Sequence, residues 1–196
     1  WKMSLLVSAL ITGIAAVHYY YMRDYWLATE SSPTFFRYVD WILTVPLMCV
    51  EFYLLTKLAG AKKSLLWKLI LASTWMLVCG YIGEAFSDGT TGHSVTWGVL
   101  STIGYLYIAY TVWFGEVAQL AEKSNSDAIK KGVKYLAWFV LAGWSIYPIG
   151  YMCMEGGWLS SVMAPESIDV WYNIADAINK IGFGLVVYSI AIAESN

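Results

Sequence analysis

The most informative stretch of the chain is residues 36–51, which read FRYVDWILTVPLMCVE. It has the composition of one apolar helix, yet it carries an arginine and two acids, which are costly in such a helix and are rarely there for packing alone. Asp40 and Glu51 are eleven residues apart, about three turns, so they share a face about 16 Å apart along the axis. Arg37 precedes Asp40 by one turn. Two acids in this arrangement suggest two stations of a proton path, with a basic partner expected between them.

The composition indicates a membrane protein. Of 196 residues, 59% are hydrophobic and 13% are charged, whereas soluble domains are typically about 25% charged. The net charge of −2 gives no reason to expect nucleic acid as a partner. Cys49, Cys79 and Cys153 all fall in apolar runs and are expected to be small buried hydrophobes. The two histidines are too far apart for a zinc motif, so we expect no metal site.

Six segments are apolar over the roughly 20 residues that a helix needs to cross a bilayer. They predict an all-α fold, a polytopic bundle of transmembrane helices in a single domain over residues 1–196. Residues 116–131 are expected to be the one long polar connection. The chain starts at Trp1, already within an apolar run, so we expect further sequence before it. The predicted spans are residues 3–22, 34–57, 64–86, 94–115, 133–154 and 169–193.

Lysines set the predicted orientation, because basic residues concentrate in cytoplasmic loops. They flank the connections after the second and fourth spans. The connections at the other end have Arg23 as their only basic residue, with acids that include Asp88 and Asp169. Both visible ends of the chain are therefore expected on the cytoplasmic side, with Asp40 toward the exterior and Glu51 toward the cytoplasm. The lysines are Lys57, Lys62, Lys63, Lys68, Lys123, Lys130, Lys131 and Lys134.

The basic partner is predicted in the last span, where Asp176 and Lys180 are one turn apart on one face. A lysine in hydrocarbon has to be paired, neutral or covalently modified. One interpretation is a plain ion pair that aids packing. If Asp40 faces the same lysine, however, two acids surround one base. A permanently protonated Schiff base between the two carboxylates then accounts for the set, since lysine amines form Schiff bases with carbonyl compounds.

Aromatic residues of the fifth span form a stripe at Trp144, Tyr147 and Tyr151, with i, i+3, i+7 spacing. Taken alone, such a stripe is more often part of an ordinary core. With Trp41 of the second span as an opposite wall, it would instead suit a flat, apolar, rod-like ligand.

Together these motifs make the chain similar to the microbial rhodopsins, and more narrowly to the proteorhodopsin and xanthorhodopsin group of light-driven proton pumps. The resemblance runs over the whole chain in order. It implies a seven-helix fold, of which the second to seventh helices are visible in this sequence. The motifs that carry it are Arg37-Tyr38-Val39-Asp40-Trp41 with Thr44, Pro46 and Glu51, then Trp144-Ser145-Ile146-Tyr147-Pro148, and then Asp176 with Lys180.

The resemblance implies a light-driven ion transporter, not an enzyme, with a role for each charged residue. Lys180 would bind all-trans retinal as a protonated Schiff base, with Asp40 as primary counterion and proton acceptor and Asp176 as second counterion. Arg37 would balance charge on the exterior side. Glu51 would be the cytoplasmic donor that reprotonates the Schiff base. Protons would then move outward, in agreement with the orientation inferred from the lysines.

Other polar residues take roles from the same resemblance. Thr44 would hydrogen-bond near Asp40. His18 would pair with that acceptor carboxylate, although a lone histidine near a helix end is more often a satisfied interface residue. Glu84 is expected to be a solvated helix end, with proton release as the lesser alternative. Tyr19 is expected to line the site near the second counterion.

The resemblance also implies how retinal is held. Trp41, Trp144 and Tyr147 would sandwich the polyene, and Tyr105 would lie at its ring end. Met48, two turns after the acceptor, would touch the polyene. Because an apolar residue there does not stabilise the ground-state charge as a polar glutamine would, we expect green rather than blue absorption.

Further expectations concern neighbours of the site and alternatives to the pump. Gly98 in the fourth span would either leave a window for a carotenoid antenna or only permit close helix packing. Pumps of this kind commonly form homo-oligomers such as pentamers, and we expect a multi-pass protein of the bacterial inner membrane. One alternative is a photosensory rhodopsin of the same fold, against which the donor Glu51 argues. Another is a membrane transporter or structural protein without a chromophore, which requires Asp176 and Lys180 to serve packing alone.

Overall fold

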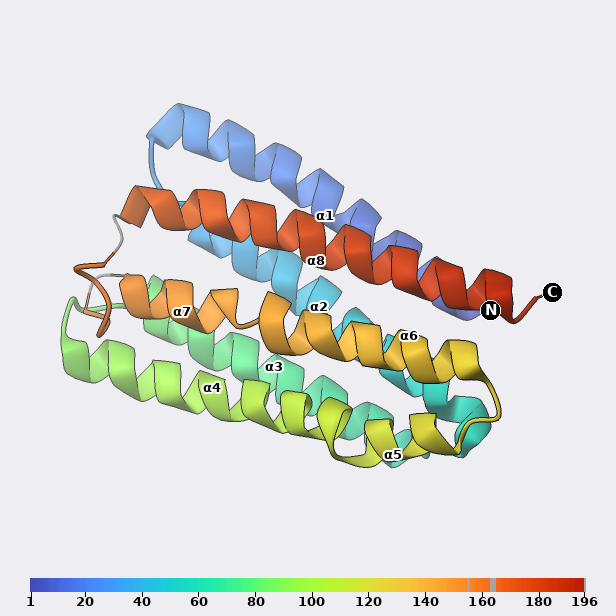
Figure 1. The fold of residues 1–196 in the computed structure, drawn as a ribbon. Coiled ribbons are helices and arrows are strands. Elements are labelled where there is room, and N and C mark those ends of the chain that lie inside the picture. The colour runs from blue at the N-terminus through green and yellow to red at the C-terminus, as the bar shows by residue number, and fades with distance from the viewer. Residues whose placement is uncertain (155, 163–164, 196) are drawn as a thin grey trace.

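The computed structural model describes residues 1–154, 156–162 and 165–195. Its helices run side by side along one common direction (Figure 1). Six helical stretches among the described residues are long and apolar enough to cross a membrane, so the prediction of an all-α bundle with six spans is confirmed. In chain order the elements are α1 (Lys2–Thr29), α2 (Thr34–Thr56), η1 (Lys57–Ala59), α3 (Lys63–Ala85), α4 (Thr91–Trp113), α5 (Glu116–Lys123), α6 (Asp127–Trp138), η2 (Phe139–Gly143), α7 (Ile146–Cys153) and α8 (Pro165–Ala193).

The burial pattern is the reverse of that in a soluble bundle. Leu71, Ile103 and Leu185 are each more than half exposed on the outer surface, whereas Asp40 and Glu51 are fully buried in α2. Charged groups that face a bundle interior while apolar groups face outward are typical of proteins in lipid. The chain is therefore a multi-pass membrane protein.

Helix α2 carries the buried charges because it lies inside the bundle. It packs against α1 and α3, and α8 packs against α1, α6 and α7. Both chain ends, η1 and the turn between α5 and α6 lie at one end of the bundle (Figure 1). The lysine-rich connections thus meet at one end, and the connections with few basic residues meet at the other, as the orientation argument requires.

The polar stretch at residues 116–131 is not the simple connection that we expected. It contains the short helix α5 and the start of α6. Val117 and Ala121, one turn apart on α5, are buried in the main hydrophobic core. Because these two residues fall on one face, α5 lies against the bundle and keeps its polar face outward.

The predicted fifth span is interrupted in its middle by a π-helical turn. In η2 the Trp144 N–H donates to the Phe139 carbonyl at 2.9 Å, a spacing of five residues. The Tyr105 hydroxyl of α4 donates to the carbonyls of Val140 and Leu141, at 3.2 and 2.9 Å. Such π-turns are frequent at functional sites, and this one directly precedes the aromatic stripe of α7.

Candidate functional site

The centre of the site is a buried lysine between two carboxylates. Lys180, in the middle of α8, is 4% exposed, and Asp40 and Asp176 are at most 1% exposed. The Lys180 ammonium donates to Asp176 Oδ2 at 3.0 Å and also to Asp40 Oδ2. The basic partner predicted for the acids of α2 is therefore Lys180 of α8, which the packing of the bundle places beside Asp40.

The two carboxylates differ sharply in their hydrogen bonds. Asp176 accepts from the Tyr19 hydroxyl at 2.6 Å, from the Trp41 indole N–H at 3.0 Å and from the Tyr147 hydroxyl. Asp40 accepts from Lys180 through Oδ2, but its buried Oδ1 has no hydrogen-bond partner in the part of the chain that the structure describes. Hydrogen-bond donors stabilise an ionised carboxylate. We call Asp176 the saturated acid of the pair, because several donors surround it, and Asp40 the open acid, because one of its oxygens has room for a further donor or a proton.

Two further predicted residues lie beside Asp40. His18 Nδ1 is 3.8 Å from Asp40 Oδ1, but it is also 3.0 Å from the carbonyl of Ile14 in its own helix. The ring thus faces the acceptor without a hydrogen bond to it. Thr44 is fully buried, and its hydroxyl donates to the backbone carbonyl of Asp40 at 2.9 Å, not to the carboxylate.

Arg37 anchors a second polar cluster toward the end of the bundle that holds the α1–α2 and α3–α4 connections. Its guanidinium donates to Asp169 Oδ1 at 2.6 Å and lies 3.8 Å from Glu84 Oε1. Glu84 also accepts from the hydroxyls of Thr34, at 2.9 Å, and Tyr38, at 3.1 Å. The expectation that Glu84 is a solvated helix end is wrong, because its side chain is only 4% exposed and these three partners replace water.

Asp169 was expected in a loop and proves to be part of α8, directly paired with Arg37. Its position seven residues before Asp176, two helical turns away on the same face, is the sequence signal that could have identified it.

Glu51 lies three turns along α2 from Asp40, toward the lysine-rich end. It is fully buried, and Ser8 of α1 donates to its Oε1 at 3.1 Å. Its other oxygen, Oε2, has no hydrogen-bond partner among residues 1–154, 156–162 and 165–195. Sequence reasoning did not identify Ser8, since a single serine in an apolar span carries no signal of its own.

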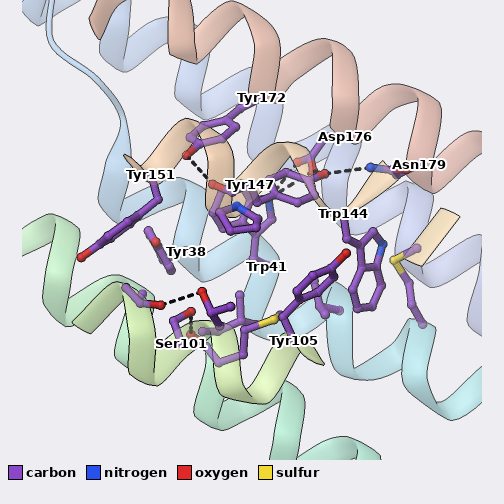
Figure 2. A pocket seen from close by; sticks show the side chains of 18 of the residues that line it. Tyr38, Trp41, Ser101, Tyr105, Trp144, Tyr147, Tyr151, Tyr172, Asp176 and Asn179 are labelled. Carbon is purple, nitrogen blue, oxygen red and sulfur yellow. Dashed lines mark hydrogen bonds between the residues drawn. The ribbon is translucent and has the colours of Figure 1, made fainter. Parts of the chain in front are cut away.

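An apolar cavity lies against Lys180 and is walled by aromatic rings (Figure 2). The Trp41 and Tyr147 rings are 5.0 Å apart, edge to face. Tyr38 and Tyr172 add rings that were not predicted. All six residues predicted to bind the cofactor line this cavity, namely Trp41, Met48, Tyr105, Trp144, Tyr147 and Lys180.

Gly98 lies between this cavity and a second apolar groove along α4. A Cβ at Gly98 would come within 2.8 Å of Tyr151 Cε1. The glycine therefore lets the Tyr151 ring approach α4, and this ring separates the cavity from the groove.

Comparisons with known proteins place this geometry in context. Residues 1–194 match the family described as bacteriorhodopsin-like protein. The chain is 41% identical over 202 residues to the green-light absorbing proteorhodopsin of Gamma-proteobacterium EBAC31A08, covering 100% of this chain and 76% of that protein. The crystal structure of a blue light-absorbing proteorhodopsin from Med12 is similar, with TM-score 0.80 and 38% identity over 99% of this chain and 84% of that one. The structure of xanthorhodopsin, titled a light-driven ion pump with dual chromophore, gives TM-score 0.82 and 31% identity over 99% and 81%.

Proposed function

The chain belongs to the bacteriorhodopsin-like family of microbial rhodopsins, and from this premise we propose that it is a light-driven pump that moves protons outward. The observation that carries the proposal is the Lys180 ammonium, buried at the wall of an aromatic cavity between the carboxylates of Asp40 and Asp176. Residues 1–196 then act as a single transmembrane retinal-binding domain.

The residues present fit retinal. Lys180 lines a cavity whose other walls are mostly aromatic and apolar, and Trp41, Trp144 and Tyr147 would hold the polyene, with Tyr105 at the ring end. All-trans retinal, bound to Lys180 as a protonated Schiff base, supplies visible absorption and light-driven isomerisation. The apolar Met48 beside it favours green absorption.

Asp40 takes the proton from the Lys180 nitrogen. Of the two acids around that nitrogen, Asp40 has an oxygen that no described residue donates to, whereas Asp176 accepts from three donors besides Lys180. A carboxylate that loses fewer hydrogen bonds on protonation is the better acceptor. His18, 3.8 Å from the open oxygen, is placed to respond to the change of charge.

Glu51 returns a proton to the Lys180 nitrogen from the cytoplasmic side. It is fully buried, it forms no ion pair with any of the described residues, and Ser8 donates to one of its oxygens. On the exterior side, Arg37 with Glu84 and Asp169 balances the charge that arrives at Asp40. The donor lies on the side of the lysine-rich loops, so the net movement is outward.

The proposal extends to surroundings and assembly. We expect a homo-oligomer such as a pentamer in the bacterial inner membrane. A carotenoid antenna at Gly98 is supported by the apolar groove along α4 and by the similarity to xanthorhodopsin, titled as having a dual chromophore.

Reconstitution tests the cofactor. The protein mixed with all-trans retinal should develop a visible band, and Lys180→Ala should abolish it. Lys134→Ala, on the lysine-rich side, is the matched control and should keep the band. A wild-type protein without a visible band, or a Lys180→Ala protein that keeps it, refutes the retinal assignment.

Illumination tests the direction of transport. Cells that express the protein should acidify an unbuffered medium in light, and a protonophore should abolish the signal. A visible band without light-driven acidification, together with a slow photocycle, would favour the photosensory alternative.

A further inference from the structure

Asn179 is a buried amide beside Lys180 that the proposed pumping mechanism does not use. It is 2% exposed and lines the aromatic cavity (Figure 2). Its Nδ2 donates to the Tyr147 hydroxyl at 3.3 Å, whereas its Oδ1 has no hydrogen-bond partner among the described residues. A buried amide that uses only one of its polar ends gains little from packing, so its place here calls for another explanation.

The direction of the hydrogen bonds around Tyr147 follows from their chemistry. The Lys180 ammonium and the Tyr147 hydroxyl both donate to the Asp176 carboxylate. The Tyr147 oxygen is then left to accept, and the amide of Asn179 has to present its NH₂ group to it. A directed chain therefore runs from Asn179 through Tyr147 to Asp176.

The same orientation forces Asn179 Oδ1 toward the π-turn. A Cβ at Gly143, the last residue of η2, would overlap Oδ1 and would lie 2.9 Å from the amide carbon Cγ. Gly143 thus allows the amide to sit where its NH₂ reaches Tyr147. Because the NH₂ end of the amide points to Tyr147, its Oδ1 is left without a hydrogen-bond partner among the described residues.

We propose that Asn179 is a positioning residue: its amide, seated against Gly143 of the π-turn, holds the Tyr147 hydroxyl in the orientation that donates to Asp176. In this way it keeps the second carboxylate saturated and leaves Asp40 as the open acid. The inference deepens the proposed function and rests on it for its consequence, but the hydrogen-bond chain itself requires no cofactor.

The first test reads the Tyr147 hydroxyl directly in retinal-free protein. The infrared C–O band of Tyr147 is isolated by subtracting the spectrum of Tyr147→Phe. Asn179→Leu keeps the side-chain size and removes both polar atoms, and it should shift this band, with Asn179→Ala as a second variant should the leucine not fold. Gly143→Ala should shift the band as well, because the added methyl displaces the amide. Gly13→Ala, whose added Cβ meets nothing within 4 Å, is the control and should leave the band unchanged.

The second test is a double-mutant cycle on the acid-induced shift of the visible band, after reconstitution with retinal. Ionisable groups from every helix around Asp176 contribute to this transition: Tyr19 of α1, Asp40 of α2, Tyr147 of α7 and Lys180 of α8. Asn179→Leu should change the proton affinity that the acid-induced shift reports by about threefold or more, which is the effect expected from the loss of one hydrogen bond. In the Tyr147→Phe background the same substitution should have no effect.

The outcomes separate the two claims. An unshifted Tyr147 band in Asn179→Leu, or an equal change of the acid midpoint in the Tyr147→Phe background, overturns the positioning role. Absence of a visible band in the wild type refutes the proposed function instead, and the infrared test on retinal-free protein still decides the role of Asn179.

Discussion

The substitution Glu51→Gln tests the proposed proton-donor role of Glu51, because it keeps the shape of the side chain and removes its acidic proton. The amide has nearly the same shape, and its Oε1 can still accept the hydrogen bond from Ser8 that Glu51 accepts at 3.1 Å. The second oxygen of Glu51 has no hydrogen-bond partner among the described residues, and Ser4 also faces the carboxylate. The variant keeps an acceptor for the serine hydroxyls and chiefly loses the proton that Glu51 can give.

The distance between Glu51 and Asp40 indicates which steps the substitution should leave unchanged, and the usual contribution of a proton donor gives the size of the expected effect. Glu51 is eleven residues from Asp40 on one helix, which at about 1.5 Å per residue is about 16 Å. At that distance the substitution should leave the visible band and the first proton transfer to Asp40 unchanged. Loss of a positioned proton donor typically costs about 10²- to 10⁴-fold in rate, so reprotonation should slow by at least about a hundredfold, or about 2.7 kcal/mol in barrier.

Flash photolysis of the reconstituted protein measures this step as the decay of the blue-shifted deprotonated species. Glu116→Gln is the matched control, because Glu116 is a partly exposed acid at the lysine-rich end that pairs with Lys68 at 3.6 Å. Its decay should equal that of the wild type. A decay in Glu51→Gln that is unchanged, or slowing of similar size in Glu116→Gln, would refute the donor assignment.

Three other substitutions test the rest of the site. Asp40→Asn should abolish light-driven acidification, because the proposed proton acceptor is lost. It should also move the visible band to longer wavelength, because one of the two carboxylates around Lys180 is lost. Continued pumping would contradict the assignment of Asp40 as the acceptor. Met48→Gln should move the band to shorter wavelength, and an unmoved band would show that Met48 does not contact the polyene. Glu84→Gln removes one of two anionic partners of a buried arginine and should lower the free energy of unfolding by about 1.5–3 kcal/mol. The exposed control Asp88→Asn should leave that free energy unchanged, and equal stabilities would mean that the Glu84 ion pair contributes nothing.

The parts of the site that could be read from the sequence are those in which a charge interrupts an apolar run. Asp40, Glu51 and Lys180 each stand out because an ionised group in a membrane span is costly and demands a partner. Asp169 and Glu84 did not stand out, because they lie at helix ends, where hydropathy cannot tell a solvated carboxylate from a buried one. The structure extends α8 back to Pro165 and buries the Glu84 side chain, so both acids face Arg37.

The π-turn at η2 illustrates a different limit. Nothing in residues 139–143 departs from an ordinary apolar helix, and a continuous span was predicted there. The turn exists because a partner elsewhere satisfies the backbone: Tyr105 of α4 donates to the carbonyls of Val140 and Leu141. A backbone irregularity that is stabilised by a distant side chain leaves no local pattern to detect.

Periodicity and composition were enough to establish six membrane spans, and they predicted the orientation of these spans and the need of Lys180 for acidic partners, because each of these is a property of one helix and its solvent. Which acid is saturated and which is open is not a property of any one helix. The donors to Asp176 come from Tyr19, Trp41 and Tyr147, on α1, α2 and α7, and only the packing of these helices brings them to one carboxylate. Among the described residues, Asp40 Oδ1 keeps no hydrogen-bond partner. The difference between the two acids thus depends on contacts between separate helices, two of which join residues more than a hundred positions apart.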